Sequence, residues 1–416
     1  MKILIISQYF WPENFRISDL AAGLVERGHQ ITILTGIPNY PSGHFFSGYG
    51  LFRHMKQDFR GAKVIRVPLI PRGNANGFRL AINYLSFMIS ACVFAPFLCR
   101  EKFHVIFVCQ LSPVTVGIPA LLMKKLKRIP VLFWVQDLWP ESLSATGAVR
   151  SKVIIDGVRK LVRFIYKHCD KILVQSPAFK PMIEKQQVVP GRIAYFPNSV
   201  EKIYQPMVIH TDIEGQSRLP SGFNVMFAGN IGFAQDFETI LSTANILRKY
   251  RDINWIILGD GRARHWVELQ VVKRELTDSV HLLGGYPMET MPQFFSLADV
   301  MLVTLKREPI LALTIPSKIQ SYMACGRPIV AALDGEGARV IRESGAGIAC
   351  PAEDSEGLAV SILGLYRMPK AEREAMGAQG VAYCKINFER EMLIDRLEDW
   401  MKDLCQKNKS ESFKSP

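Results

Sequence analysis

Short apolar runs alternate with amphipathic stretches along almost the whole chain. The run at residues 3–7 is followed by an amphipathic stretch at 17–27, and the second half repeats the pattern at 223–228 and 237–250. Uniformly apolar runs are typical of strands buried on both faces, and the stretches between them are typical of helices that connect parallel strands. The pattern therefore predicts an α/β protein with doubly wound parallel sheets.

The length indicates two domains. A chain of 416 residues exceeds one ordinary core and suits two domains of roughly 200 residues each. A polar, Gly-, Ser- and Pro-containing stretch at 205–222 resembles a linker. We expect an N-terminal Rossmann-like domain at 1–200 and a second one at 201–384. A C-terminal helix at 385–405, able to pack back on the first domain, and a flexible tail at 406–416 complete the expected organisation.

The positive charge is unevenly distributed. Residues 1–200 hold 26 basic and 10 acidic residues, whereas residues 201–416 hold 25 basic and 28 acidic ones. The N-terminal half therefore carries all of the excess positive charge, which favours an anionic partner surface. No zinc-finger spacing or RNA-binding aromatic motif accompanies this charge, so a membrane is favoured over nucleic acid. General solubility is the alternative explanation.

One segment is long and apolar enough to raise the question of a membrane span. Residues 80–98 carry no charge and approach the length that crosses a bilayer. A span would separate residues 1–79 from the sheet that they are expected to share with residues after 103. We therefore favour a helix packed in the first domain that touches a membrane surface. Eight scattered cysteines without a CxxC pair fit a reduced, cytoplasmic protein.

Four segments in the second half follow predicted strands and bear glycine or a well-placed cation. They are FAGNIG at 227–232, LGDGR at 258–262, LGGYP at 283–287, and the stretch from Glu308 through PSK at 316–318 to YMACGRPIV at 322–330. Glycine lets the backbone approach a ligand, and helix N-termini attract a diphosphate. Lys318 opens a helix, where a lysine is unfavourable unless it faces an anion. A tight turn or a solvated side chain is the alternative explanation for each segment taken alone.

Taken in order, these segments resemble the donor domain of family 4 glycosyltransferases with the GT-B fold, in which two Rossmann-like domains face a central cleft. The first half agrees, with QYFWPE at 8–13, TGIPNYPSG at 35–43 and QDLWPES at 136–142. Together the motifs resemble the fucosamine-transferase-like branch, which serves bacterial O-antigen, colanic-acid-type, capsule and exopolysaccharide synthesis. The resemblance covers nearly the whole chain.

The resemblance implies roles for particular residues. The candidate catalytic residues are Asp137, Glu141, Glu308 and Lys318. The candidate donor-binding residues are Gly229, Asn230, Gly232, Gln235, Gly259, Asp260, Gly261, Arg262, Tyr286, Ser317 and Lys318. The candidate acceptor-binding residues are Trp11, Asn14, Arg16, Asn39 and Trp139.

The sequence departs from the family pattern at three places. The usual pair of glutamates falls on Leu313 and Ser321, so Glu308 is the candidate to replace the first of them. The Arg and Lys that usually follow the first glycine loop are replaced by the stretch at 233–236, so Lys318 and Arg262 are the candidates to hold the diphosphate. The sugar-facing histidine is replaced by Gln136 or Asp137.

The resemblance implies a retaining, metal-independent glycosyltransferase without a cofactor. It would move a sugar, N-acetyl-L-fucosamine or a related deoxyamino sugar, from a nucleotide donor such as a UDP-sugar. The acceptor would be an undecaprenyl-diphosphate-linked saccharide at the anionic inner face of the cytoplasmic membrane, in lipopolysaccharide or related biosynthesis. The alternatives are a nucleotide-sugar 2-epimerase on the same fold and a non-catalytic partner subunit.

Overall fold

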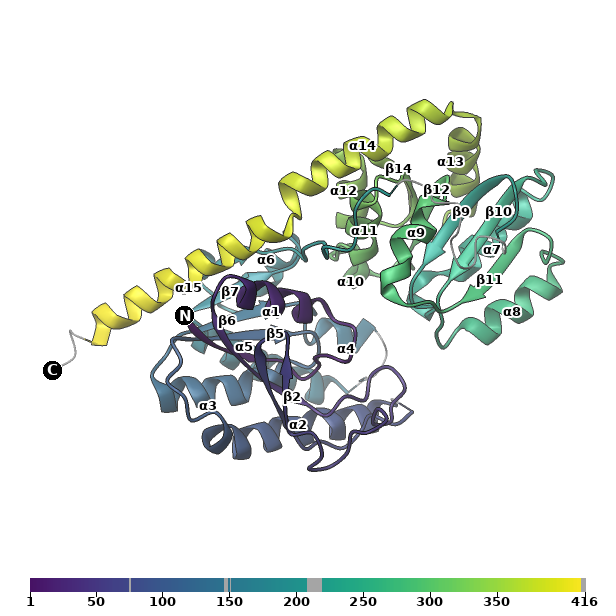
Figure 1. Cartoon of the computed structure of the whole chain (residues 1–416). Coiled ribbons are helices and arrows are strands. Elements are labelled where there is room, and N and C mark those ends of the chain that lie inside the picture. Colours follow the sequence, from purple (N-terminus) through teal and green to yellow (C-terminus); the bar gives the residue numbers. More distant parts are fainter. Residues whose placement is uncertain (75, 146–148, 150, 208–218, 413–416) are drawn as a thin grey trace. The chain divides into compact units, whose positions relative to one another are not determined.

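The computed structural model describes residues 1–416 except 75, 146–148, 150, 208–218 and 413–416. The chain divides into two compact units, one formed by Met1–Pro197 with Arg390–Pro416 and the other by Asn198–Glu389 (Figure 1). The division after Pro197 lies close to residue 200, where we expected it. Most of the expected linker at 205–222 lies outside the described residues.

Unit 1 is built on a sheet in the order β3-β4-β2-β1-β5-β6-β7-β8, parallel except for β3, which runs antiparallel to β4. Its central strands are buried on both faces, as the uniformly apolar runs predict. The sequence pattern did not predict the short edge strands β3 and β8. The strands are β1 (Lys2–Ile6), β2 (Gln30–Gly36), β3 (Lys56–Phe59), β4 (Ala62–Val67), β5 (Val105–Gln110), β6 (Val131–Val135), β7 (Lys171–Val174) and β8 (Ile193–Tyr195).

Helices cover both faces of this sheet (Figure 1). On one face α2 (Gly77–Leu98) packs against β2 and β4, and α3 (Gly117–Lys127) lies between α2 and α5 (Lys152–His168). On the other face α1 (Arg16–Glu26) packs against α15 (Arg390–Ser412). Residues 406–412, which we expected to be a flexible tail, thus continue a helix. The remaining short helices are α4 (Glu141–Ala145) and α6 (Phe179–Glu184).

Unit 2 is built on a wholly parallel sheet in the order β11-β10-β9-β12-β13-β14. Successive side chains of β9 point to opposite faces: Met226 joins one core, and Val225 and Phe227 join the other. The edge strand β14 was not expected from the sequence. The strands are β9 (Phe223–Ala228), β10 (Ile253–Leu258), β11 (Val280–Gly284), β12 (Val300–Thr304), β13 (Ile329–Ala332) and β14 (Gly347–Cys350).

The helices of unit 2 form two layers, one on each face of its sheet. The first core contains side chains of α9 (Met291–Ser296), α11 (Ser317–Ala324), α12 (Glu336–Ser344) and α14 (Lys370–Asn387). The second contains side chains of α7 (Phe237–Ile246), α8 (Arg264–Lys273) and α13 (Ser355–Arg367). A parallel sheet with both faces covered leaves the loops at the carboxyl ends of its strands as the usual place for a ligand.

Candidate functional site

The three glycine loops of unit 2 lie at one edge of its sheet and are hydrogen-bonded to one another. The N–H of Gly229, after β9, donates to the carbonyl of Leu258 at 2.9 Å, and the N–H of Gly259, after β10, donates to Gly284 at 2.8 Å. The N–H of Ile231 donates to the backbone carbonyl of Asp260 at 2.8 Å. Loops that are separate in the sequence therefore form one continuous surface of backbone.

Glycine is required where these loops touch. A Cβ on Gly259 would lie 1.9 Å from the carbonyl oxygen of Gly229, and the φ of Gly259 is +134°. A Cβ on Gly261 would lie 2.4 Å from the carbonyl oxygen of Ile231 and 2.5 Å from the side-chain oxygen of Asn230. Only glycine allows both the dihedral angle and the close approach. The segments that the sequence singled out are thus structurally constrained.

Lys318 reaches this surface from the first turn of α11. Its Nζ donates to Oε1 of Gln235 at 2.6 Å and lies 3.8 Å from the centre of the Phe227 ring. A Cβ on Gly229 would lie 3.4 Å from Nζ. Removal from water lowers the pKa of Lys318 to about 7. The structure therefore brings together Gly229, Gln235 and Lys318, three of the predicted donor-binding residues.

Tyr322, one turn after Lys318, fixes α11 against the end of β9. Its hydroxyl donates to the carbonyl of Ala228 at 2.9 Å and accepts from the N–H of Ala228 at 3.0 Å. Tyr322 is fully buried, and burial raises the pKa of its hydroxyl. The sequence analysis included Tyr322 in a motif but did not predict this positioning role, because nothing local indicates the partner strand.

The remaining predicted donor residues surround this group of side chains. Arg262 is exposed and Arg264 is bound to Glu268 at 2.8 Å, so Arg262 is the better placed of the two to meet a ligand. The Asp260 carboxylate accepts from the N–H of Gly261 at 2.7 Å, which shapes the second loop. Tyr286 packs on Phe294 with ring centres 4.6 Å apart. Four further predicted residues are at least partly exposed at the same loops: Asn230, Gly232, Ser317 and Glu308.

The positions of the usual glutamate pair hold no carboxylate. Leu313 follows the short helix α10 (Pro309–Ala312), and Ser321 is buried in α11, where its hydroxyl donates to the backbone carbonyl of Ser317 at 3.4 Å. Glu308 precedes α10 as an exposed residue, and its carbonyl accepts from the N–H of Leu311 at 2.9 Å. Glu308 thus stands after β12, on the loop that leads to α11.

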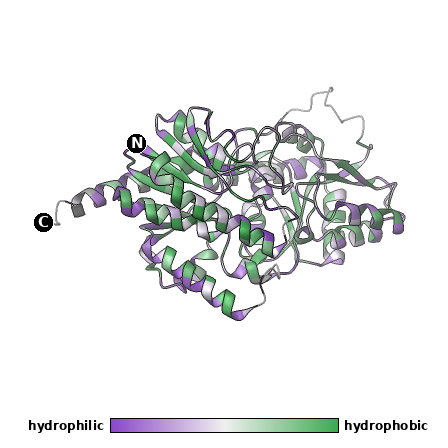
Figure 2. Cartoon of the chain, turned by 90° about the horizontal axis from the view of Figure 1, so that it is seen from below, coloured by the Kyte–Doolittle hydropathy of each residue, from purple (hydrophilic) through white to green (hydrophobic). Residues whose placement is uncertain are grey.

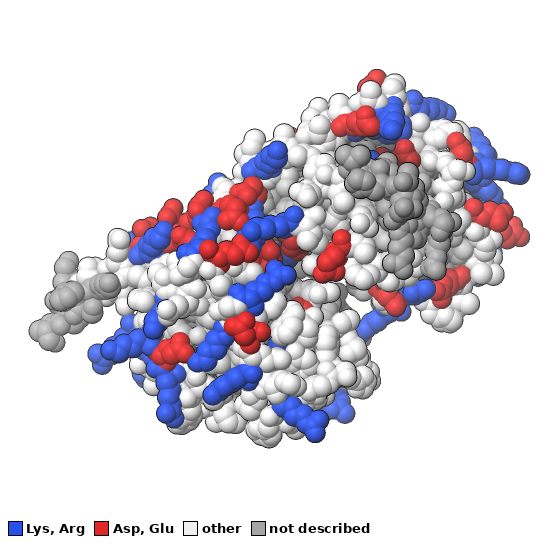
Figure 3. Space-filling model, in the orientation of Figure 1, with Lys and Arg blue, Asp and Glu red and all other residues white. Residues whose placement is uncertain are grey.

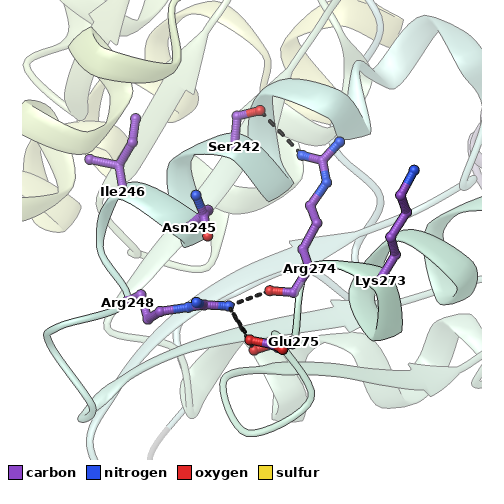
Figure 4. Close-up of a pocket in the computed structure, with 7 residues that line it drawn as sticks. All are labelled: Ser242, Asn245, Ile246, Arg248, Lys273, Arg274 and Glu275. Carbon is purple, nitrogen blue, oxygen red and sulfur yellow. Dashed lines mark hydrogen bonds and ion pairs between the residues drawn. The ribbon is translucent and has the colours of Figure 1, made fainter.

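A pocket of about 610 Å³ lies elsewhere in unit 2, where α7 and α8 end (Figure 4). Both helices start at the loop edge and run back, so this pocket belongs to the opposite edge of the sheet. Its arginines already have partners: Arg274 binds both carboxylate oxygens of Glu238 at 2.7 Å, and Arg248 donates to the carbonyl of Glu275 at 3.1 Å. The pocket is therefore no alternative donor site.

In unit 1 the loops after β1 and β2 are joined by the buried Glu13. Its carboxylate accepts the N–H groups of Asn39 and Tyr40 at 2.8 Å each, and that of Phe10 at 3.2 Å. Burial outweighs these hydrogen bonds and raises the pKa of Glu13 to about 7. Glu13 was not predicted as a functional residue, although it ends the QYFWPE motif at 8–13.

Arg66 of β4 is hydrogen-bonded to the backbone of the same two loops. It is fully buried and donates to the carbonyls of Trp11 at 2.7 Å and Gly36 at 3.4 Å. A buried arginine that donates to backbone carbonyls positions the loops. Nothing in the sequence around Arg66 predicts this role, because its partners come from distant segments.

The predicted acceptor residues divide into buried and accessible ones. Asn39 is fully buried, and its side-chain oxygen accepts the N–H of Arg72 at 3.2 Å, so Asn39 shapes the loop from inside. Trp11 and Arg16 are partly exposed and Asn14 is exposed, so these three can reach a ligand.

Asp137 and Trp139 are bound to each other after β6. One carboxylate oxygen of Asp137 accepts from Trp139 Nε1 at 3.1 Å and from the Ser142 hydroxyl at 3.2 Å. Burial raises the pKa of Asp137 to about 6. Glu141 opens α4 and is partly exposed. Asp137 therefore has a structural role in this loop, whatever its part in chemistry.

The His, Cys, Asp and Glu side chains of the described residues form no metal cluster. Within residues 1–412, apart from the gaps given above, no group of three or more His, Cys, Asp and Glu could hold a metal ion. Metal independence stays a prediction.

One described helix, α2, has the length and the mean hydropathy, 1.7, to cross a membrane. Of the 18-residue stretch with this hydropathy, 22% is buried. Such a helix by itself is weak evidence for a span.

Two family models match the chain. Residues 14–199 match the "Glycosyl transferase 4-like domain" and residues 222–368 match "Glycosyl transferases group 1". The chain is 23% identical over 341 residues to WcaI of Escherichia coli (strain K12), a glycosyl transferase assigned by its name to colanic acid biosynthesis. This match covers 78% of the chain and 82% of WcaI.

Solved structures with the same fold include sucrose-phosphate synthase from Thermosynechococcus elongatus, at 17% identity and a TM-score of 0.74, over 97% of this chain and 98% of that one. HepE from Anabaena, solved with UDP-glucose, is 16% identical with a TM-score of 0.70, over 97% and 100% of the two chains. The two sheets and their strand-end loops, together with these matches, define a glycosyltransferase of the GT-B fold. The chain belongs to glycosyltransferase family 4.

Proposed function

We propose that the protein transfers a sugar from a nucleoside diphosphate donor, held at the strand-end loops of unit 2, to a lipid-linked saccharide. The observation that carries the proposal is the position of Lys318, whose ammonium lies beside Gly229 and Gln235 at the edge of exposed backbone. A cation in the first turn of a helix, beside a backbone surface that a ligand can approach, suits a diphosphate. The complex of HepE with UDP-glucose supports a UDP-sugar as the donor.

The same residues can assist the chemistry. When the bond between the anomeric carbon and the diphosphate oxygen breaks, negative charge develops on the diphosphate. Cations and helix N-termini aimed at that charge lower the barrier because they stabilise it most in the transition state. Lys318, the N-terminus of α11 and the exposed Arg262 are placed for this task.

The reaction proposed retains the anomeric configuration and uses neither metal ion nor cofactor. The acceptor hydroxyl attacks the face from which the diphosphate leaves, and its proton passes to the departing oxygen or to a carboxylate. Asp137, Glu141 and Glu308 are the candidate carboxylates. A carboxylate with a pKa near 6, as in Asp137, can accept a proton at neutral pH.

The proposed pathway is bacterial surface polysaccharide synthesis, as O-antigen, capsule or exopolysaccharide. The name of WcaI supports this class of product. The proposed donor sugar is N-acetyl-L-fucosamine or a related deoxyamino sugar, and the proposed acceptor is an undecaprenyl-diphosphate-linked saccharide. Such an acceptor would place the protein on the inner face of the cytoplasmic membrane, a location that the basic N-terminal half suits.

The test is incubation of the protein with UDP- and GDP-sugars and bacterial lipid extract, followed by mass spectrometry of lipids and nucleotides. We expect transfer of one sugar to a lipid-linked saccharide with release of the nucleoside diphosphate, and an Arg262→Ala variant that is slower. Interconversion of the sugar nucleotide without lipid would indicate a 2-epimerase instead. No reaction with any donor would indicate a non-catalytic subunit.

A further inference from the structure

The outer side of α2 is an uncovered apolar surface. Leu85, Ile89, Val93 and Phe97 follow each other at every fourth residue and are 47%, 57%, 53% and 64% exposed. Residues with this spacing lie on one side of a helix. Exposing a row of large apolar side chains to water is energetically unfavourable. The row extends along the second half of α2, so we expect a binding partner to cover it.

The inner side of the same helix is fixed to the sheet. Phe87, Ala91 and Ala95 are fully buried, and so is Asn83. The Asn83 side chain accepts from Gln8 Nε2 at 2.7 Å and donates to the carbonyl of Ile70 at 2.6 Å. Spanning a bilayer would break these polar contacts and uncover the sheet. The helix is therefore held with only its outer side free.

The uncovered apolar surface continues over the two neighbouring helices of this face. Leu126 at the end of α3 is 55% exposed, and Val153, Ile154 and Phe164 of α5 are at least half exposed. Because α3 packs against both α2 and α5, the three helices form one layer on this side of the sheet. Figure 2 views the protein from below, the side on which α2 and α3 lie in Figure 1, and hydrophobic residues are interspersed with polar ones on the helices in front.

The charge of this layer has one sign. The helices α2, α3 and α5 together carry nine Lys and Arg residues and one acidic residue, Asp156. On the opposite face α15 carries six acidic and five basic residues. Figure 3 shows acidic and basic side chains mixed along α15 and mainly basic ones lower in the same unit. These three helices thus carry a net charge of +8, which is half of the excess of +16 in residues 1–200.

We propose that the layer of α2, α3 and α5 docks on an anionic lipid bilayer, with α2 lying in the plane of the interface. Apolar side chains flanked by Lys and Arg bind such a surface by burial and by attraction to the headgroups. A second copy of the chain is a poorer occupant, because a symmetric dimer through this layer would bring like charges together. The inference rests on the proposed membrane location and on the expected contact of residues 80–98 with a membrane, and it adds the apolar row of α2 together with α3 and α5 as the docking surface.

The test is flotation of the full chain with vesicles of phosphatidylcholine, with and without phosphatidylglycerol. We expect binding to the mixed vesicles only, and a loss of about tenfold or more in Ile89→Glu/Val93→Glu, since two apolar side chains no longer enter the interface. The matched control is Val272→Glu/Val360→Glu, which changes two valines of unit 2 that are 66% and 71% exposed and should bind as the natural chain does. Melting curves check that all variants fold.

Two further experiments test the role of the surface lysines and the depth to which the protein enters the bilayer. Lys125→Gln/Lys160→Gln should weaken binding at low salt by about thirtyfold, because each of the two lysines near the surface contributes about 1 kcal/mol, and the difference should vanish at high salt. High salt followed by alkaline carbonate should release the bound protein. Retention after both washes would overturn the in-plane orientation and indicate a span.

Other outcomes would overturn the docking surface itself. Equal binding by the Ile89→Glu/Val93→Glu variant would exclude the α2 row. A dimer in sedimentation that dissociates in this variant would assign the surface to a second copy of the chain. Failure of the proposed function is distinguishable, because vesicle binding needs no donor: absence of transfer with normal flotation would refute the function and leave the surface standing.

Discussion

Lys318 lies in surroundings that oppose its positive charge until an anion arrives. Its ammonium is partly withdrawn from water, stands at the N-terminus of α11 and has one neutral acceptor, Gln235. The Phe227 ring beneath it offers a weak attraction. Withdrawal from water lowers the pKa of Lys318 to about 7, so that in the free protein a large fraction is uncharged near neutral pH.

Donor binding should therefore weaken as the pH rises above 7. A bound diphosphate raises the pKa of Lys318, so the complex holds more protons than the free protein above pH 7. Affinity for a nucleoside diphosphate should fall as pH rises from 7 to 9, by up to about tenfold per pH unit. Calorimetric titration of UDP or GDP over this range measures the slope.

The matched variants separate this effect from general electrostatics. Lys318→Gln should bind about tenfold or more weakly at pH 7 and lose the slope, because a hydrogen bond between charged groups is replaced by a neutral one. Lys273→Gln, in the pocket at the opposite edge, should keep both affinity and slope. An equal slope in Lys318→Gln would remove Lys318 from the diphosphate site.

At the scale of elements, a single substitution can test the contact between the glycine loops of unit 2. Gly259→Ala places a methyl group 1.9 Å from the Gly229 carbonyl oxygen at a φ that alanine rarely adopts. The two loops must separate, and we expect diphosphate affinity to fall more than about tenfold, with a lower melting temperature. Gly364→Ala is the control: in α13 nothing lies within 4 Å, and the change should stabilise by about 0.5–1 kcal/mol. Normal affinity in Gly259→Ala would contradict the loop assignment.

The sequence predicts such loops because their signal is local. A glycine after an apolar run indicates a strand end, and parallel strands bring such ends to one edge, so the positions of Gly229, Gly259 and Gly261 followed from the pattern. The contact of Gln235 with Lys318 did not, since the two lie 83 residues apart and either side chain alone looks solvated. The same holds for Glu13 and Arg66, whose partners are chosen by the folded chain.

For the whole molecule, the C-terminal helix completes a unit that begins at residue 1. Arg390 is nearly buried and binds Asp19 at 2.7 Å and Glu26 at 3.2 Å, and Arg27 binds Glu391 at 2.9 Å. Leu393, Ile394, Leu397 and Met401 are fully buried in the core that α1 and the central strands share. The sequence predicted a helix able to pack back, but its long-range partners and its length only emerge in the fold.

A charge in that helix should therefore unfold unit 1 and leave unit 2 able to bind its ligand. Leu397→Asp buries a carboxylate among apolar side chains that the native leucine fills, at a cost of several kcal/mol. We expect calorimetry of the full chain to show one transition at a much lower temperature, and a second transition that a nucleoside diphosphate still raises. Leu269→Asp, at a leucine of α8 that is 54% exposed, controls for the added charge and should leave both transitions in place. If Leu397→Asp instead lowered both transitions together, the two units would unfold as one, and α15 would stabilise the molecule as a whole rather than the unit it completes.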